Sequence, residues 1–331
     1  MKYRDNDYIF GNALIHALEN SLIDYDKLMR IAQASGVNDA LRILSECGYP
    51  DVPGGLDARI NAKRREVFCA VETACPENNI TEFFRIRYYC NNIKAVVKGE
   101  FSGRDYADLI TDVGGIDSRD IAAFVKDELN GNRGSLPDWI CECALSARDA
   151  LKASNDAAAA DLIIERAGFA AMLECAKNSE SAFLTDYCRL LIDSVNLKTA
   201  VRLAVTGRAS RQYLEQSVIP GGSIEFSELP DNGSILDFIE MYEKTSLSPA
   251  VNAAKDAANG KGSFSDVTEI TEREKWDFLA QAKNVTFGEH PIIAYVASYE
   301  AEFIAVHAVM SCIASGISTD SVMERLRWHY V

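Results

Sequence analysis

Apolar residues recur at helical spacing along almost the whole chain, and this period constrains the fold more than any other feature of the sequence. Between residues 290 and 315 they step by four and three positions in turn, from Ile292 to Ile313, which lays one apolar seam along about six turns of a helix. Runs in which apolar and polar residues alternate, as they do in strands, are nearly absent. The sequence therefore predicts an all-α protein.

Clusters of Gly, Pro and Asn divide the helical pattern into segments, among them NGNRGSLP at 130–137 and IPGG at 219–222. Such clusters end helices because Gly adopts turn conformations and Pro cannot continue a helix. We expect helices over 7–20, 24–34, 37–47, 57–74, 80–98, 117–129, 137–153, 156–177, 181–206, 234–243, 267–283, 290–315 and 319–329.

Three of the longer helices share a sequence pattern. They contain YCNNIKAVVKG (89–99), DSVNLKTAVRLAVTG (193–207) and EFIAVHAVMSCIASG (302–316). When they are aligned, one column holds Asn92, Asn196 and Ala305, and another, two residues later, holds Lys94, Lys198 and His307. Because the segments lie about 105 residues apart, the pattern predicts three similar helical domains. The expected domains are 1–110, 111–215 and 216–331.

The formal net charge is −15, from 34 basic and 49 acidic residues. Affinity for nucleic acid depends largely on Lys and Arg side chains that displace counterions from phosphates. A surface devoted to nucleic acid is therefore not expected, although a local basic patch is compatible with this charge. An acidic surface that favours solubility is the simplest interpretation.

Nine cysteines, an odd number without a CxxC pair, lie mostly in apolar helical segments where thiols pack as small hydrophobes. This distribution predicts a protein of the reducing cytosol, in which the cysteines form no disulfide framework. The start, MKYRDNDYIF, lacks the apolar core of a signal peptide, and Glu300, Glu302 and His307 interrupt the most apolar stretch, 291–315. We therefore expect no membrane span.

The sequence contains no motif for catalysis or cofactor binding. The segment NGKGSF lacks the Ser or Thr and the leading Gly of a phosphate-binding loop, and no GxSxG elbow or dinucleotide fingerprint occurs. The four histidines lie far apart, without the spacing of metal ligands. We expect no catalytic residue, no cofactor and no metal site, while an enzyme with a dispersed site stays an alternative.

Glu302 is the titratable residue with the most unusual predicted setting, because it lies beside the apolar seam of its helix. An unpaired carboxylate would be costly there. Gly316 can end the helix that contains Glu302, and Ser318 can cap the start of the next one. The last predicted helix could then fold back toward Glu302. We therefore predict a partly buried ion pair between Glu302 and Arg325 or Arg327.

The sequence resembles the C subunits of the bacterial and archaeal V-type (A-type) ATPases, a family that includes the d subunit of the eukaryotic vacuolar enzyme. The similar features are the N-terminal run FGNALIHALENSLIDYDKLMRIAQASGVNDALRILSECGYPD, the NIK and NLK helices, the IPGG turn, and HPIIAYVASYEAEF leading into MERLRWHYV. Their order and spacing extend over nearly the whole chain. The segment 111–160 departs most from the family pattern, which leaves the boundary between the first two domains open.

The resemblance implies three similar helical domains that form a funnel with pseudo-threefold symmetry. It implies a non-catalytic central-stalk (rotor) subunit, cytoplasmic and peripheral on the inner face of the cell membrane. Its partners would be the central shaft subunits of the ATPase head and the cytoplasmic loops of the membrane rotor ring, and its task would be torque transmission for proton or sodium transport. A helical scaffold or adaptor outside the rotary ATPases is the alternative.

Overall fold

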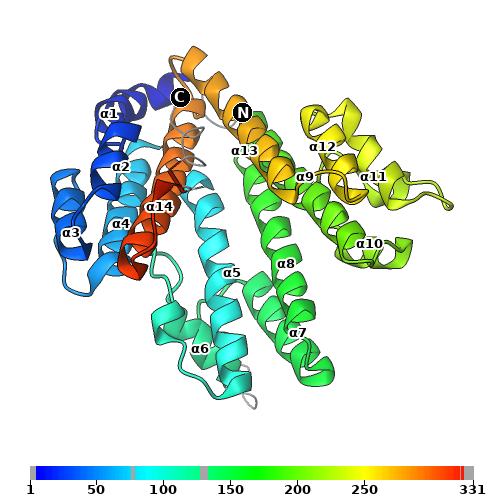
Figure 1. The fold of residues 1–331 in the computed structure, drawn as a ribbon. Helices are drawn as coiled ribbons and strands as arrows, with labels where there is room; N and C mark the ends of the chain where they lie inside the picture. The colour runs from blue at the N-terminus through cyan, green and yellow to red at the C-terminus, as the bar shows by residue number, and fades with distance from the viewer. Residues whose placement is uncertain (1–4, 76–78, 127–132, 321, 324–331) are drawn as a thin grey trace. The chain divides into compact units, whose positions relative to one another are not determined.

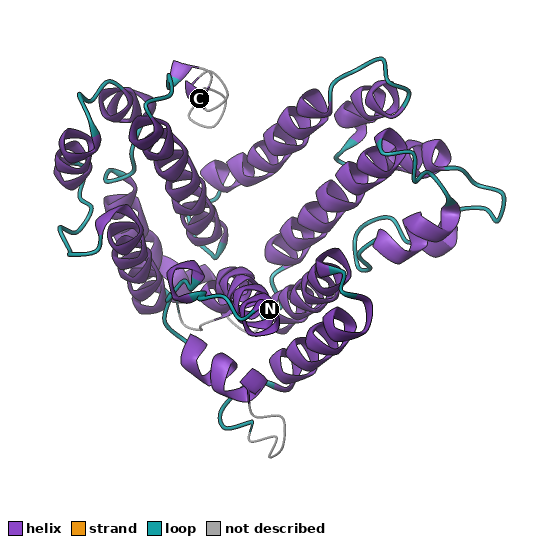
Figure 2. Cartoon of the chain, turned by 60° about the horizontal axis from the view of Figure 1, so that its bottom comes forward, coloured by secondary structure: helices purple, strands orange, loops and turns teal. Residues whose placement is uncertain are grey.

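The computed structural model describes residues 5–75, 79–126, 133–320 and 322–323, and every regular element in these ranges is a helix (Figures 1 and 2). The predicted all-α fold is confirmed. The α-helices are α1 (Ile9–Glu19), α2 (Tyr25–Ala32), α3 (Val37–Glu46), α4 (Gly55–Ala74), α5 (Asn79–Ser102), α6 (Ser118–Lys126), α7 (Asp138–Ser154), α8 (Ala157–Asn178), α9 (Ala182–Val205), α10 (Arg211–Ser217), α11 (Ile235–Met241), α12 (Ser248–Ala258), α13 (Phe264–Ala280) and α14 (His290–Ser315). Short 3-10 helices are η1 (Asp5–Tyr8), η2 (Ala107–Leu109), η3 (Phe226–Glu228), η4 (Tyr242–Lys244) and η5 (Gln281–Asn284).

Most predicted helices agree with observed ones to within a few residues, and the prediction for 290–315 coincides with α14. The sequence does not predict α10 or α12. Helix α10 is only seven residues long, and α12 is so rich in alanine that its apolar period is weak. Most of the helix predicted over 319–329 lies outside the described residues.

Contacts between residues divide the chain into two compact units. Unit 1 comprises Met1–Thr81 and Leu279–Val331, so it joins segments from the two ends of the chain. Unit 2 comprises Glu82–Phe278. The three domains expected from the sequence stay a prediction.

Helix α14 is the core of unit 1, and α1, α2, α3 and α4 all pack against it. Its buried side chains extend from Pro291 to Met310. Helices α1 and α4 approach closely, since a Cβ on Gly11 would lie 2.1 Å from the carbonyl oxygen of Ala74. Only glycine fits at this crossing.

Among the described residues, α14 is also a helix long and apolar enough to cross a membrane, judged by length and composition alone. Within its most apolar window, 61% is buried inside the protein. The core helix of a folded unit meets the same criteria, and α14 occupies that position in unit 1.

In unit 2, α7 and α9 pack on α8, while α10, α11 and α12 pack on α9. The Ser181 side chain accepts a hydrogen bond from the Leu184 backbone N–H, which caps the start of α9. Asn155 ends α7 in the left-handed conformation, with φ 54°. Helices α5 and α8 approach closely where Gly168 faces Cys90, because a Cβ on Gly168 would lie 2.4 Å from Sγ.

Candidate functional site

Three columns of residues on α5, α9 and α14 include side chains that contact the loops and the neighbouring long helices of each unit. The amide column is Asn92, Asn196 and Ala305, and the cation column is Lys94, Lys198 and His307. Both follow the alignment made from the sequence. The structure adds a docking column three residues before the amide column: Tyr89, Asp193 and Glu302.

The two asparagines of the amide column make the same pair of hydrogen bonds. Asn92 Nδ2 donates to the Thr111 carbonyl at 2.9 Å, and the Thr111 N–H donates back to Oδ1 at 2.9 Å. Asn196 forms the same exchange with Ile219, at 2.8 Å in each direction. Each buried carboxamide thus satisfies both backbone groups of one loop residue and fixes that loop to its long helix.

Ala305 cannot form this exchange on α14, but a comparable one occurs elsewhere in unit 1. Asn12 on α1 donates to the Gly288 carbonyl and accepts from the Gly288 N–H, both at 3.0 Å. Asn12 is 1% exposed. It fixes the loop that precedes α14 to α1.

Each residue of the docking column is buried and accepts a backbone N–H from a loop. The bonds are Ile116 N to Tyr89 Oη at 3.4 Å, Ser223 N to Asp193 Oδ1 at 2.9 Å, and Ile23 N to Glu302 Oε2 at 2.6 Å. The three loops share an isoleucine followed by an acidic residue, just before the next short helix begins. These dipeptides are Ile23–Asp24, Ile116–Asp117 and Ile224–Glu225.

Each residue of the cation column lies beside a carboxylate of another long helix. Lys94 Nζ is 2.9 Å from Glu165 on α8, Lys198 Nζ is 3.4 Å from Glu272 on α13, and His307 Nε2 is 3.6 Å from Asp57 on α4. The two lysine pairs are partly buried, whereas the histidine pair is mostly exposed. The first two therefore contribute more to holding their helices together.

Glu272 has a second cationic partner, Lys275, whose Nζ lies 2.6 Å from the carboxylate. Burial opposes ionisation of Glu272, yet Lys275 and Lys198 together hold its pKa below the ordinary value. Burial also lowers the pKa of Lys275, against the attraction of Glu272. One partly buried carboxylate thus pairs with two lysines.

Glu302 is 1% exposed and accepts two hydrogen bonds, from Ile23 N to Oε2 and from Tyr49 Oη to Oε1, each 2.6 Å long. Burial raises the pKa of Glu302 to about 7, although both hydrogen bonds favour the charged form. Arg325 and Arg327 lie outside the described residues, so their pairing with Glu302 stays a prediction. Tyr49 and Ile23 were not expected as partners from the sequence, and the repeated Ile-acidic dipeptide is the signal that could have found Ile23.

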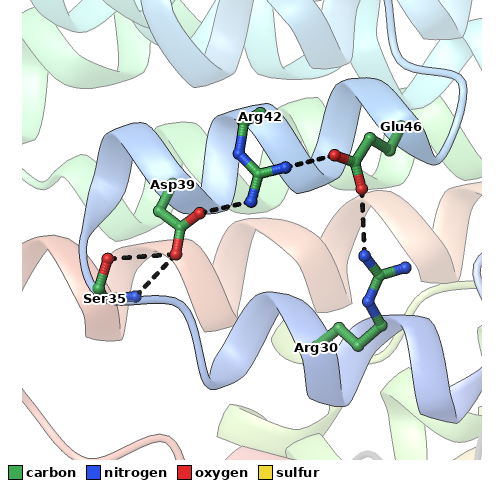
Figure 3. A network of polar contacts seen from close by, with 5 residues as sticks. All are labelled: Arg30, Ser35, Asp39, Arg42 and Glu46. Carbon is green, nitrogen blue, oxygen red and sulfur yellow. Dashed lines mark hydrogen bonds and ion pairs between the residues drawn. The ribbon is translucent and has the colours of Figure 1, made fainter.

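An exposed ion-pair network ties α2 to α3 (Figure 3). Arg42 contacts Asp39 at 2.8 Å and also bonds Glu46, which is 3.1 Å from Arg30 on α2. The Arg42 guanidinium lowers the pKa of Asp39. Because these side chains are exposed, the network contributes little to stability and marks no site.

Two surface grooves lie in the described parts of the chain. One, of about 570 Å³, lies in unit 1 along α1 and α4. The other, of about 390 Å³, lies in unit 2 along α5, beside the segment 104–109. Within the described ranges, no group of three or more His, Cys, Asp or Glu side chains is placed to hold a metal ion.

Comparison with known proteins gives a match along most of the sequence. Residues 11–325 match the model of the ATP synthase (C/AC39) subunit family. The chain is 20% identical over 338 residues to the C subunit of the A-type ATP synthase of Thermococcus kodakarensis, covering 96% of this chain and 89% of that protein. It is 22% identical over 330 residues to the C subunit of the V-type sodium ATPase of Enterococcus hirae, covering 96% and 98%.

Proposed function

Because the chain belongs to the ATP synthase (C/AC39) subunit family, we propose that it is a non-catalytic central-stalk (rotor) subunit of a V/A-type rotary ATPase. It would connect the central shaft of the soluble head to the membrane rotor ring and transmit torque between them. The observation that carries this proposal is the extent of the match, which spans nearly the whole chain and nearly the whole of both relatives.

The repeated contacts support an arrangement of three similar domains around a pseudo-threefold axis. Each would be built on one pair of long helices bridged by the cation column: α4 with α14, α5 with α8, and α9 with α13. The short helices between them would be fixed by the docking column. This arrangement differs from the domains 1–110, 111–215 and 216–331 expected from the sequence, because it joins α14 to the N-terminal helices. The composition of unit 1 supports that change.

A part that transmits torque must resist deformation, and the columns suit this task. Each buried polar contact has a defined geometry, so sliding a short helix along its long helix would break hydrogen bonds as well as apolar packing. The tight glycine crossings at Gly11 and Gly168 likewise leave little room for movement. We infer that these features keep each helical domain rigid while load passes through it.

The proposed partners are the shaft subunits of the ATPase head and the cytoplasmic loops of the rotor ring. The protein would then lie in the cytoplasm, peripheral on the inner face of the cell membrane. Transport of either protons or sodium ions fits this role, and so does flux in either direction.

Capture of the tagged protein from detergent-solubilised membranes, followed by mass spectrometry, tests the proposal. We expect head, shaft and ring subunits in the captured material, and a preparation without any of them would contradict the role. In a second measurement, membranes depleted of the protein should lose ATP-driven ion transport. The isolated head should retain ATP hydrolysis, because the protein itself performs no chemical step in this role.

A further inference from the structure

We propose that Glu302 is a proton-sensitive latch, which holds the loop at Ile23 and the side chain of Tyr49 against α14, and that the stability it gives to unit 1 falls as the pH rises, because the buried carboxylate loses its hydration. The latch lies at the centre of unit 1. It joins α14 to two segments that are more than 250 positions away in the sequence. It operates within one protein chain, so it does not depend on the proposed role in a rotary ATPase.

The geometry places the carboxyl group where it contacts both segments at once. Ile23 is fully buried and Tyr49 is 3% exposed, so neither donor has ready access to water. The Tyr49 ring also packs edge-on against Phe303, with ring centroids 6.2 Å apart. A second polar contact, Ser21 Oγ to Tyr299 Oη at 2.7 Å, holds the same loop to α14.

Two opposing effects act on the proton of Glu302. Desolvation disfavours the carboxylate, whereas the two donated hydrogen bonds favour it. Their balance places the pKa of Glu302 at about 7 instead of the ordinary 4.5. The charge on this buried group therefore changes within the range of neutral pH.

Among the described residues, the cations that act on Glu302 come from helices that pack on α14. Lys27 on α2 and Lys63 on α4 both favour the carboxylate, but each ammonium group donates to a backbone carbonyl, that of Leu22 or Gly48. Those carbonyls belong to the residues directly before Ile23 and Tyr49. The lysines thus support the two segments that the latch holds.

The other titratable groups around Glu302 in the described part of the chain oppose its ionisation or balance one another. Interaction with the Glu302 charge contributes to raising the pKa of Cys47, Tyr295 and Tyr299. Glu19 on α1 acts on Tyr295 in the same direction. On α4, Arg64 stacks on Phe303 and lies 3.8 Å from Glu300, so these two charges offset each other.

The sign of the pH dependence follows from proton binding. Between pH 4.5 and 7 the folded protein keeps the Glu302 proton, whereas the unfolded chain releases it. Stability from this group is therefore complete below pH 4.5, declines between about pH 4.5 and 7, and levels off above that range. The equilibrium constant for unfolding should rise up to tenfold per pH unit, by roughly 300-fold in total.

The test compares chemical unfolding of the full chain and of Glu302→Gln at half-unit steps from pH 5 to 8.5. Glutamine does not titrate. Its carbonyl oxygen can accept from the Ile23 N–H, and its amide N–H can donate to the Tyr49 hydroxyl, so the bond to Tyr49 is kept with its direction reversed. The pH dependence of the difference between the two proteins therefore isolates the carboxyl group. We expect the ratio of their unfolding constants to change at least 30-fold over this range. Glu66→Gln, which removes a carboxylate with 58% of its side chain exposed, is the matched control and should show no such change.

A second measurement needs no variant. The amide resonance of Ile23, assigned in isotope-labelled protein, should shift with pH with a midpoint near 7. A constant ratio of unfolding constants from pH 5 to 8.5, or an Ile23 amide that titrates only below pH 5, would overturn the latch. The second result is what a permanent ion pair with Arg325 or Arg327 would give.

Discussion

The Tyr49 hydroxyl donates a 2.6 Å hydrogen bond to the carboxyl group of Glu302, 253 positions further along the chain. The bond connects the segment between α3 and α4 to the middle of α14. It therefore joins the two sequence segments that make up unit 1.

Replacing Tyr49 with Phe should destabilise unit 1 more at pH 8 than at pH 5. At pH 8 the lost hydrogen bond is one to a charged acceptor, so we expect a loss of about 1.5–3 kcal/mol. At pH 5 the acceptor is neutral and the loss should be about 0.5–1.5 kcal/mol. Urea unfolding at both pH values measures this difference, with Tyr213→Phe, at a tyrosine that is 48% exposed, as control. Equal losses of stability at the two pH values would contradict a Glu302 that is charged at pH 8 and neutral at pH 5.

Asn92→Ala should lower the free energy of unfolding by about 2–4 kcal/mol, because it strands both backbone groups of Thr111. The adjacent Asn91 is exposed, so Asn91→Ala changes the same helix without breaking a loop contact. Urea unfolding of the two variants provides the comparison. If both are equally stable, the amide column does not hold the loop.

Removing Glu272 should cost more than removing one of its lysines. Glu272→Gln leaves Lys198 and Lys275 close together in a partly buried setting, and we expect a loss of about 2–3 kcal/mol. Lys198→Met leaves Glu272 paired with Lys275, and the loss should be about 1 kcal/mol or less. Thermal unfolding measures the stability of both variants. A larger loss for Lys198→Met than for Glu272→Gln would contradict a carboxylate shared by the two lysines.

An experimental structure should contain three superposable groups of helices. We expect α5 to α8, α9 to α13, and α14 followed by α1 to α4 to coincide when the docking, amide and cation columns are matched. As a control, the three groups are also superposed with the alignment shifted by one residue. This shift turns the matched positions to another side of each helix, so the columns should no longer coincide. Groups that coincide only in another register would show the columns to be unrelated.

The purified protein should bind no ATP tightly. A phosphate-binding loop is missing from the sequence, and torque transmission requires no nucleotide. Isothermal titration with ATP and magnesium should give no measurable heat of binding at micromolar concentrations. Micromolar affinity would require a nucleotide-binding function in addition to the proposed one.

Much of the fold could be predicted from the sequence because long amphipathic helices leave a clear period. For this reason the predicted limits of α14, 290–315, agree with the observed ones. The cation column could also be aligned, since Lys94 and Lys198 share a side chain type. Their carboxylate partners could not be found, because Glu165 and Glu272 lie on other helices more than 70 positions away.

The docking column could not be predicted because its residues differ in type. Tyr89, Asp193 and Glu302 share only the ability to accept a hydrogen bond from a loop N–H. The prediction for Glu302 assumed that a buried carboxylate needs a cation. In the structure its described partners are a hydroxyl and a backbone N–H, which sequence alone does not reveal.

Unit 1 is built from two segments that are far apart in the sequence, and this limits when it can fold during synthesis on the ribosome. Helix α4 ends at Ala74, but α14, on which it packs, begins only at His290. At about 5–20 residues per second, the ribosome needs roughly 10–40 s to make the chain between them. Throughout this time the apolar faces of α1 to α4 lack their central helix, while unit 2 is already emerging. The N-terminal helices of the nascent chain therefore cannot pack on their central helix until α14 has been made.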